Sequence, residues 1–214
     1  MELYILRHGI TEWNKVARFQ GQVDIPLAPE GVSLAEEAAI GMKHIKFDHC
    51  FSSPLSRARK TAEIILGDSD IEIVNDKRIM EMSFGDWEGL VSRGKHADIT
   101  PEQRLALYDP SENGYRPNNG EAIRDVIKRA GDFLESMKEL EKEGAERVLV
   151  STHGVCSRAI LQHYWQDGDF WHGNVPPNCC VSILTMKDGK LTDLQQDIIF
   201  YESEPIDYYG NGNE

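Results

Sequence analysis

Two histidines close short apolar runs of the chain, and each is followed by a glycine. His8 comes after the run at 3–6, and His153 comes after the run at 147–151. Such runs are typical of buried strands, so we expect the two imidazoles to share one site. Arg7 lies beside His8, and a guanidinium repels metal cations while its planar set of donors attracts phosphate. These residues predict a phosphate-handling enzyme with a histidine nucleophile.

Apolar runs alternate with segments of helical period along the whole chain. Strands are expected over 3–6, 48–52, 71–74, 147–151, 179–187 and 190–200, and helices over 34–45, 55–66, 121–143 and 154–165. Asp188-Gly189 predicts a hairpin turn between the last two strands. The alternation predicts an α/β fold, a three-layer α/β/α sandwich around a mixed sheet that is mostly parallel. Ligands bind at the carboxyl ends of such strands, where His8 and His153 fall.

The helix starts and the irregular segments can also be anticipated. Ser53-Pro54 is expected to cap and open the helix at 55–66, and Pro29 suits a first helical turn. The segment 88–120 mixes charge with Gly, Pro and Asn, and it predicts an insertion over the site that selects the substrate. A flexible tail is expected over 202–214. We expect the chain 1–214 to form a single domain.

The composition excludes several classes of function. A formal charge of −13 argues against nucleic-acid binding and means that any phosphate site needs a local cluster of arginines. We expect no membrane association, because no run approaches the length of a membrane-spanning helix. An early strand leaves no room for a signal peptide, and four cysteines without CxxC spacing indicate buried thiols. Together these features predict a cytoplasmic protein.

Five motifs follow one another along the chain. They are Leu6-Arg7-His8-Gly9-Ile10-Thr11-Glu12-Trp13-Asn14, Arg18-Phe19-Gln20-Gly21-Gln22-Val23-Asp24-Ile25-Pro26-Leu27, Ser52-Ser53-Pro54-Leu55-Ser56-Arg57-Ala58, Glu81-Met82-Ser83-Phe84-Gly85-Asp86-Trp87-Glu88-Gly89 and Ser151-Thr152-His153-Gly154. Together these motifs resemble the histidine phosphatase superfamily, whose fold is called phosphoglycerate mutase-like. They occur in the family's order and span residues 3 to about 183. The resemblance therefore covers most of the chain.

The resemblance implies a role for each residue type at the site. His8 would attack phosphorus and carry the phosphoryl group, and Glu81 would give a proton to the leaving alkoxide. The clamp on the phosphoryl oxygens would be formed by Arg7, Arg57 and His153. Further donors to the phosphate would come from Asn14, Gln20, Gly21 and Gly154. No metal and no cofactor is expected, and two histidines acting as metal ligands would conflict with the neighbouring arginines.

The activity within the family stays open between two reactions. The run Phe84-Gly85-Asp86-Trp87-Glu88-Gly89 resembles the phosphatase branch, which includes α-ribazole phosphatases and broad-specificity phosphatases. We therefore expect a phosphomonoesterase acting on a small phosphorylated metabolite. Mutase-type phosphoryl transfer is the alternative, and a non-catalytic module that binds a phosphorylated ligand is a third possibility. The oligomeric state, monomer or homodimer, is left open.

The chain also departs from the family pattern. A Pro-Gly-Gly-Glu-Ser stretch that often opens the long helix is replaced by 118–122, Asn-Asn-Gly-Glu-Ala, which removes a capping serine. Ala28 before Pro29 is likewise a poor cap. Arg93, Lys95 and Arg116 in the insertion could hold a second anionic group or simply be solvated charges.

Overall fold

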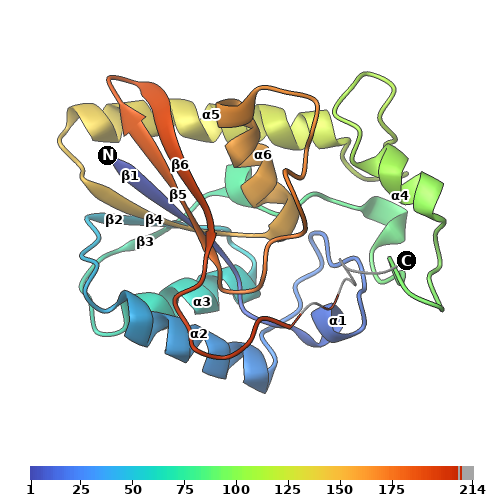
Figure 1. Cartoon of the computed structure of the whole chain (residues 1–214), viewed down its shortest axis with the longest axis horizontal. Coiled ribbons are helices and arrows are strands. Elements are labelled where there is room, and N and C mark those ends of the chain that lie inside the picture. Colours follow the sequence, from blue (N-terminus) through green and yellow to red (C-terminus); the bar gives the residue numbers. More distant parts are fainter. Residues whose placement is uncertain (207, 209–214) are drawn as a thin grey trace.

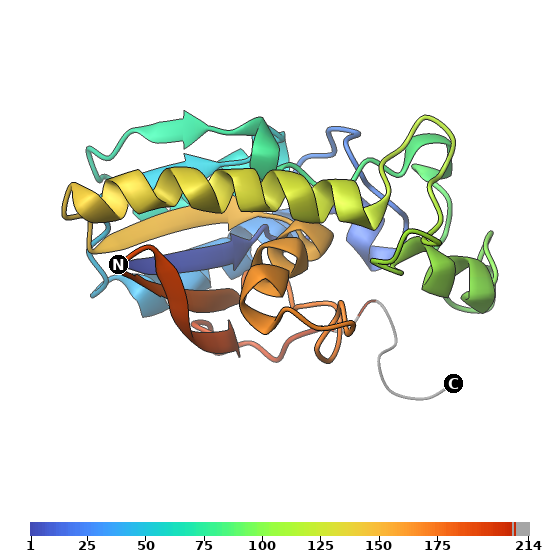
Figure 2. The same cartoon turned by 90° about the horizontal axis from the view of Figure 1, so that it is seen from above.

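A central sheet with helices on both faces forms the body of the molecule. The computed structural model describes residues 1–206 and Tyr208. Helices α2 (Pro29–Met42) and α3 (Ser56–Leu66) cover one face, and α5 (Ile123–Lys142) and α6 (Gly154–Trp165) cover the other (Figures 1 and 2). The expected three-layer α/β/α sandwich is confirmed.

The strands of the described residues form one mixed sheet of six, in the order β3-β2-β4-β1-β5-β6. Their bounds are β1 Glu2–Arg7, β2 His49–Ser52, β3 Ile73–Asn75, β4 Arg147–Thr152, β5 Val181–Lys187 and β6 Lys190–Ile198. The first four strands of that order run parallel, whereas β5 pairs antiparallel with β1 and with β6. The predicted terminal hairpin is therefore present at the edge. The short strand β3 lies two residues later than its predicted start.

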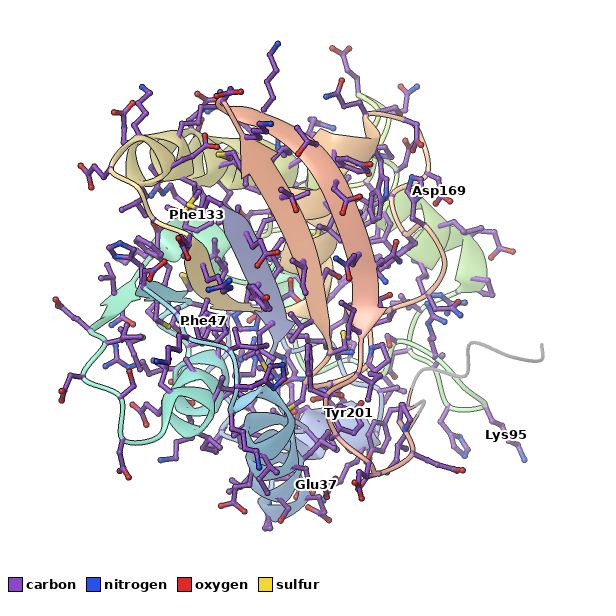
Figure 3. All side chains as sticks on the ribbon, turned by 60° about the vertical axis from the view of Figure 1, so that its left-hand side comes forward. Glu37, Phe47, Lys95, Phe133, Asp169 and Tyr201 are labelled. Carbon is purple, nitrogen blue, oxygen red and sulfur yellow. The ribbon has the colours of Figure 1, made fainter. Side chains whose placement is uncertain are left out.

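Side chains that alternate along the strands fill two apolar layers. Leu3 and Ile5 of β1 pack with Phe133 of α5 in the larger cluster, and Phe133 lies between α5 and the sheet (Figure 3). Tyr4 and Leu6 of the same strand pack on the opposite face, in a cluster shared with α2 and α3. With both faces covered, the strand ends are the places where polar groups can gather.

Helices α2 and α3 begin without a capping side chain of their own. Ala28 precedes α2 and makes no side-chain hydrogen bond, as the sequence indicated. Helix α3 begins at Ser56, so the prediction that Ser53-Pro54 caps and opens it is wrong. The carboxylate of Asp24 supplies the cap from another loop, accepting from the Ser56 amide and hydroxyl at 2.7 Å each. A cap from a distant loop leaves no local sequence signal.

The segment 88–120 extends beyond the sheet and carries a short helix, α4 (Pro101–Leu107). Thr100 and Gln103 form a capping box at its start. Lys95 projects from the outer part of this segment, away from the sheet (Figure 3). The predicted flexible tail at 202–214 falls largely outside the described residues.

The remaining elements are short. They are α1 (Glu12–Lys15) and the 3₁₀ turns η1 (Lys77–Ile79) and η2 (Gly85–Trp87). All four cysteines, Cys50, Cys156, Cys179 and Cys180, are buried free thiols, as expected. In the described part of the chain, no helix has the length and apolar character that crossing a membrane requires.

Candidate active site

The register of the parallel strands brings the ends of β1, β2 and β4 together. Arg7 pairs with Thr152, and Ser52 pairs with Ser151. The alignment continues just past the end of β1, where the His8 amide donates to the Thr152 carbonyl at 3.0 Å. The rings of His8 and His153 consequently lie side by side, with centroids 5.1 Å apart and planes inclined by 60°. The two motif histidines share one site.

His8 is buried in a form suited to nucleophilic attack. Its Nδ1 lies 2.6 Å from the Gly9 carbonyl oxygen, which can only accept, so the ring proton belongs on Nδ1 and the lone pair on Nε2. Burial, reinforced by the charges of Arg57 and Arg7, holds the pKa of His8 well below its ordinary value. The imidazole is therefore neutral at neutral pH.

His153 has a defined tautomer as well. Its Nε2 lies 2.8 Å from the Ser53 hydroxyl, and that hydroxyl oxygen accepts from the Leu55 amide. The Ser53 proton is thus available to His153 Nε2, which places the ring proton on Nδ1. This Nδ1 is buried without a hydrogen-bond partner among the described residues. Burial and the charge of Arg57 lower the pKa of His153 far below normal, so it too is neutral.

Two buried arginines flank the imidazoles. Arg57, in the first turn of α3, donates from Nη1 to the Val23 carbonyl at 2.9 Å and from Nη2 to the Gly21 carbonyl at 2.7 Å. Arg7 donates to the Pro176 carbonyl. Both guanidiniums are tied to backbone oxygens, which are neutral acceptors, so they keep their full charge for an anion.

The loop that follows α1 forms one wall of the site. Gln20 is buried, and its Oε1 accepts from the Thr11 hydroxyl at 2.9 Å. Gly21 has a φ of +54°, and a Cβ there would lie 2.1 Å from the Glu88 carboxylate. That carboxylate accepts from the Gln22 and Phe84 amides at 2.9 and 3.1 Å. Glu88, which the sequence did not single out, therefore joins this loop to the segment bearing Glu81.

Glu81 is 8% exposed and faces the same cavity as His8. Its carboxylate accepts from the amides of Val155 at 3.2 Å and Cys156 at 3.0 Å, at the start of α6. These are two of the helix amides that have no partner within the helix, so Glu81 caps α6 from a distance. A surface carboxylate would make no such contacts.

Two asparagines lie behind the histidines. Asn14 is fully buried and does not line the cavity; its Oδ1 accepts from the Thr11 amide at 3.0 Å. Its expected bond to phosphate stays a prediction. Asn178, which sequence reasoning missed, donates from Nδ2 to the carbonyls of His8 at 2.9 Å and Gly9 at 3.2 Å. No motif marks Asn178, because only the fold brings its loop to His8.

The cavity between these groups measures about 60 Å³, and its charged lining is strongly basic. The lining arginines are Arg7, Arg18, Arg57, Arg93 and Arg104, and Glu81 is the one acidic lining residue among those the structure describes. A local positive potential therefore exists in a chain with a charge of −13. Gly154 also lines the cavity. Of the three basic residues considered in the insertion, Arg93 lines it, whereas Lys95 does not and Arg116 pairs with Asp125.

Metal-ligating side chains do not cluster: within 1–206 and Tyr208, no group of three or more His, Cys, Asp or Glu is placed to hold a metal ion. The cavity is instead lined by the side chains of five arginines, whose guanidinium donors match phosphate oxygens.

This fold and this site define a family. Residues 3–196 match the model of the histidine phosphatase superfamily (branch 1), and the chain belongs to that superfamily. The probable phosphoglycerate mutase GpmB of Escherichia coli is 35% identical over 165 residues, which cover 75% of this chain and 73% of that protein. The predicted family is confirmed.

Solved structures with the same architecture include two bacterial proteins. YhfR of Bacillus stearothermophilus has a TM-score of 0.80 and 29% identity, covering 94% of this chain and 99% of its own. A putative α-ribazole-5′-P phosphatase of Escherichia coli K-12 has a TM-score of 0.75 and 26% identity, covering 91% and 94%. The names of these relatives span phosphatase and mutase activities, so the comparisons support an enzyme of either kind.

Proposed function

We propose that this protein hydrolyses phosphomonoesters through a phosphohistidine on His8. The observation that carries the proposal is a pair of neutral, buried imidazoles lying between two buried guanidiniums. A neutral imidazole is a nucleophile, and fixed positive charge beside it stabilises the charge that develops on the phosphoryl oxygens. No other arrangement in the described residues combines these features.

The reaction runs in two steps. His8 Nε2 attacks phosphorus while the bond from phosphorus to the ester oxygen breaks, and the Glu81 carboxyl gives its proton to the departing alkoxide. The resulting Glu81 carboxylate then takes a proton from water as the water oxygen attacks phosphorus and the N–P bond breaks. Inorganic phosphate leaves, and both side chains return to their starting states. Arg7, Arg57 and His153 Nδ1–H contact the phosphoryl oxygens throughout.

The substrate is proposed to be a small phosphorylated metabolite, selected by the segment 88–120. Arg93, Arg104 and Tyr108 of this segment line the cavity together with Trp171. Phosphatase is favoured over mutase because Phe84 and Trp87 follow Glu81 in the phosphatase-type pattern. The mutase name of the GpmB relative keeps the second activity as the alternative that the experiment must exclude.

The test compares phosphate release with isomerisation. The wild-type protein is expected to release phosphate from p-nitrophenyl phosphate. With 3-phosphoglycerate as substrate, we expect phosphate release to be faster than isomerisation, with or without the bisphosphorylated primer. Rapid isomerisation with little free phosphate would identify a mutase instead. Binding of a phosphorylated ligand with neither activity would identify a binding module. EDTA is expected to leave turnover unchanged, because the proposed steps use only side chains.

A further inference from the structure

The segment that carries Glu81 has almost no regular structure of its own. The turn η1 ends at Ile79, Met80 is extended with φ −65° and ψ 159°, and the next element, η2, begins only at Gly85. Residues 80–84 therefore cannot be held by a helix or strand ladder. A proton donor needs its carboxyl fixed to within a fraction of an ångström, so the position of this segment must be determined from outside.

Arg129 of α5 provides the first part of that support. Its Nη1 donates to the carbonyls of Arg78 and Met80, both at 2.7 Å, and its Nη2 donates to the Glu81 carbonyl at 3.0 Å. One planar guanidinium thus binds three backbone carbonyls within the four residues 78–81. A lysine ammonium, which is a compact charge without a fork, cannot reproduce this set of directions.

Glu121 provides the second part. Its carboxylate forms a bidentate pair with Arg129, with Nε–Oε1 at 2.9 Å and Nη2–Oε2 at 3.1 Å. The same Oε2 accepts from the Ser83 amide at 2.8 Å. Arg129 therefore holds the backbone up to Glu81, and Glu121 holds it two residues beyond.

The pair lies in a setting where its bonds are strong. The side chains of Arg129 and Glu121 are 17% and 22% exposed. Burial alone would lower the pKa of Arg129, but the nearby Cys156, Glu121 and Glu81 raise it above its ordinary value. Arg129 is thus permanently charged, and charge-assisted hydrogen bonds in partly buried positions exceed neutral ones in strength.

We propose that Arg129 and Glu121 are positioning residues that set where the Glu81 carboxyl meets the leaving-group oxygen. The amides of α6 orient the carboxylate of Glu81, while the pair on α5 fixes its backbone. Neither Arg129 nor Glu121 lines the cavity, so both act through Glu81 and do not touch the substrate. This inference rests on the proposed function, because it requires Glu81 to donate a proton.

The dependence of turnover on the leaving group tests the inference. p-Nitrophenolate departs with little help from an acid, whereas an alkoxide needs the proton. Arg129→Lys is expected to lower kcat for ethyl phosphate about 10-fold more than kcat for p-nitrophenyl phosphate, with KM for each within about twofold of wild type. Glu121→Gln is expected to change the ratio in the same direction by a smaller factor. Equal losses on both substrates would overturn the proposal.

Arg78→Lys is the matched control. Arg78 also ties this segment to α5, donating to the Asp132 carbonyl at 2.8 Å and the Ser136 hydroxyl at 3.0 Å, but none of its side-chain hydrogen bonds within the described residues goes to residues 80–83. It is expected to lower Tm without changing the ratio between the two substrates. A ratio altered as much by Arg78→Lys as by Arg129→Lys would mean that any loosening of the segment suffices, and the proposal would fail.

Glu81→Gln separates this inference from the proposed function. If Glu81→Gln leaves the ratio unchanged, Glu81 is not the donor and the proposed mechanism fails. If Glu81→Gln changes the ratio of kcat between the two substrates, and neither Arg129→Lys nor Glu121→Gln changes that ratio, only the positioning role fails. Should Arg129→Lys not fold, Glu121→Gln decides. The side-chain carboxyl resonance of Glu81 in ¹³C-labelled protein gives a readout without turnover: its chemical shift at a fixed pH is expected to change in Arg129→Lys and to stay unchanged in Arg78→Lys.

Discussion

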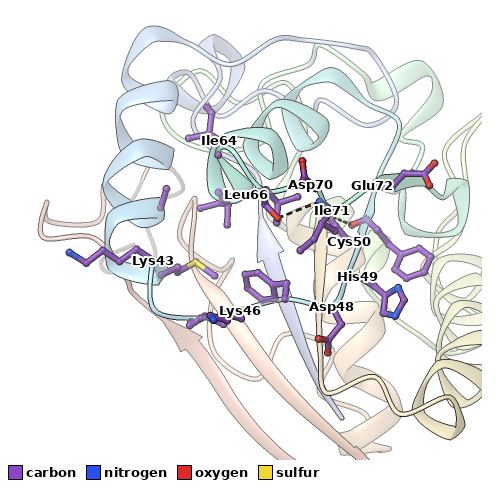
Figure 4. Close-up of a pocket in the computed structure, with 18 of the residues that line it drawn as sticks. Lys43, Lys46, Asp48, His49, Cys50, Ile64, Leu66, Asp70, Ile71 and Glu72 are labelled. Atoms are coloured by element: carbon purple, nitrogen blue, oxygen red, sulfur yellow. Dashed lines mark hydrogen bonds between the residues drawn. The ribbon is translucent and has the colours of Figure 1, made fainter.

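The two ends of the parallel strands carry hollows of opposite character. The cavity at the carboxyl ends measures about 60 Å³ and is lined by arginines and histidine. The groove at the amino ends of β2 and β3 measures about 1030 Å³ (Figure 4). Its charged residues are of both signs, namely Lys43, Lys46, Asp48, Asp70 and Glu72. Size therefore does not identify the site in this fold.

Helix direction explains the contrast. Helices α3 and α6 begin at the cavity, so the partial positive charge of their N-termini faces it. Helices α2 and α3 end at the groove, with Met42 and Leu66 in its lining, and present carbonyl groups with partial negative charge. An anion is thus favoured at one end of the sheet and disfavoured at the other. This polarity follows from the alternation of strand and helix and does not depend on the side chains.

The largest test of this contrast replaces one histidine at each end. His8→Ala is expected to lower kcat for p-nitrophenyl phosphate by about 10⁴-fold or more, because the nucleophile is lost. His49→Ala, the same change in the lining of the groove, is expected to leave kcat within about twofold. Steady-state phosphate release measures both. Substantial turnover by His8→Ala would place the nucleophile elsewhere.

A smaller loss of activity is expected when Arg57 of α3 is replaced, and its neighbour Arg59 provides the control. Arg57→Lys loses the fork that spans the carbonyls of Val23 and Gly21, and kcat/KM should fall about 10²- to 10³-fold. Arg59, two residues along, bonds to Glu63 and the Ile73 carbonyl on the outer side of the helix. Arg59→Lys should keep nearly full kcat/KM, and a matching loss there would contradict the assignment of Arg57.

Two carboxylates that cap backbone amides sharpen the comparison further. Asp24 caps α3 at the catalytic end, and Asp48 accepts from the Glu146 and Arg147 amides at the other end, at 2.7 and 2.8 Å. Each change to alanine should cost about 1 kcal/mol in the free energy of unfolding. Only Asp24→Ala should also reduce kcat/KM, by about 10-fold, because it loosens the turn that carries Arg57. Urea unfolding and kinetics separate the two effects.

The smallest effect is a dependence of stability on pH. His8 and His153 stay neutral when folded but take up protons near pH 6.5 when unfolded, so the unfolded state binds more protons as pH falls. The free energy of unfolding should therefore decrease below about pH 6.5, by up to about 1.4 kcal/mol per pH unit for each histidine. His153→Asn should make this slope shallower between pH 5 and 6.5. An unchanged slope would show that His153 is not buried neutral.

The sequence predicts the arrangement at the cavity end of the sheet well, because its signals are local. Apolar runs closed by His8 and His153, with glycines after them, place both rings at adjacent strand ends whatever lies between. Helices α5 and α6 were predicted to within about two residues because their apolar stripes are long. Arg57 was placed correctly in a first turn even though the cap assigned to Ser53 was wrong.

The contacts that hold the catalytic groups in position could not be predicted in the same way. Asp24 reaches the start of α3 from 32 residues away, and Arg129 reaches the Glu81 carbonyl from 48 residues away. Asp24 lies within the motif at 18–27, but that motif does not show which helix the carboxylate caps. Arg129 is an ordinary charged residue in its own segment, so no local pattern separates it from solvated neighbours. No sequence motif marks Asn178 either, although it donates to the His8 carbonyl. These partners follow from the packed fold and not from any short motif.

The buried thiols offer an unexpected use. Burial raises the pKa of Cys50 and Cys179 to about 12 and that of Cys156 to about 11, so in the folded protein each sulfur stays protonated and out of reach. An alkylating reagent can modify them only during a local opening, and its rate then reports how often that part opens. Cys50 lies in β2, Cys156 in the first turn of α6, and Cys179 just before β5. The alkylation rates of these three cysteines would therefore report local opening in three different regions of the fold.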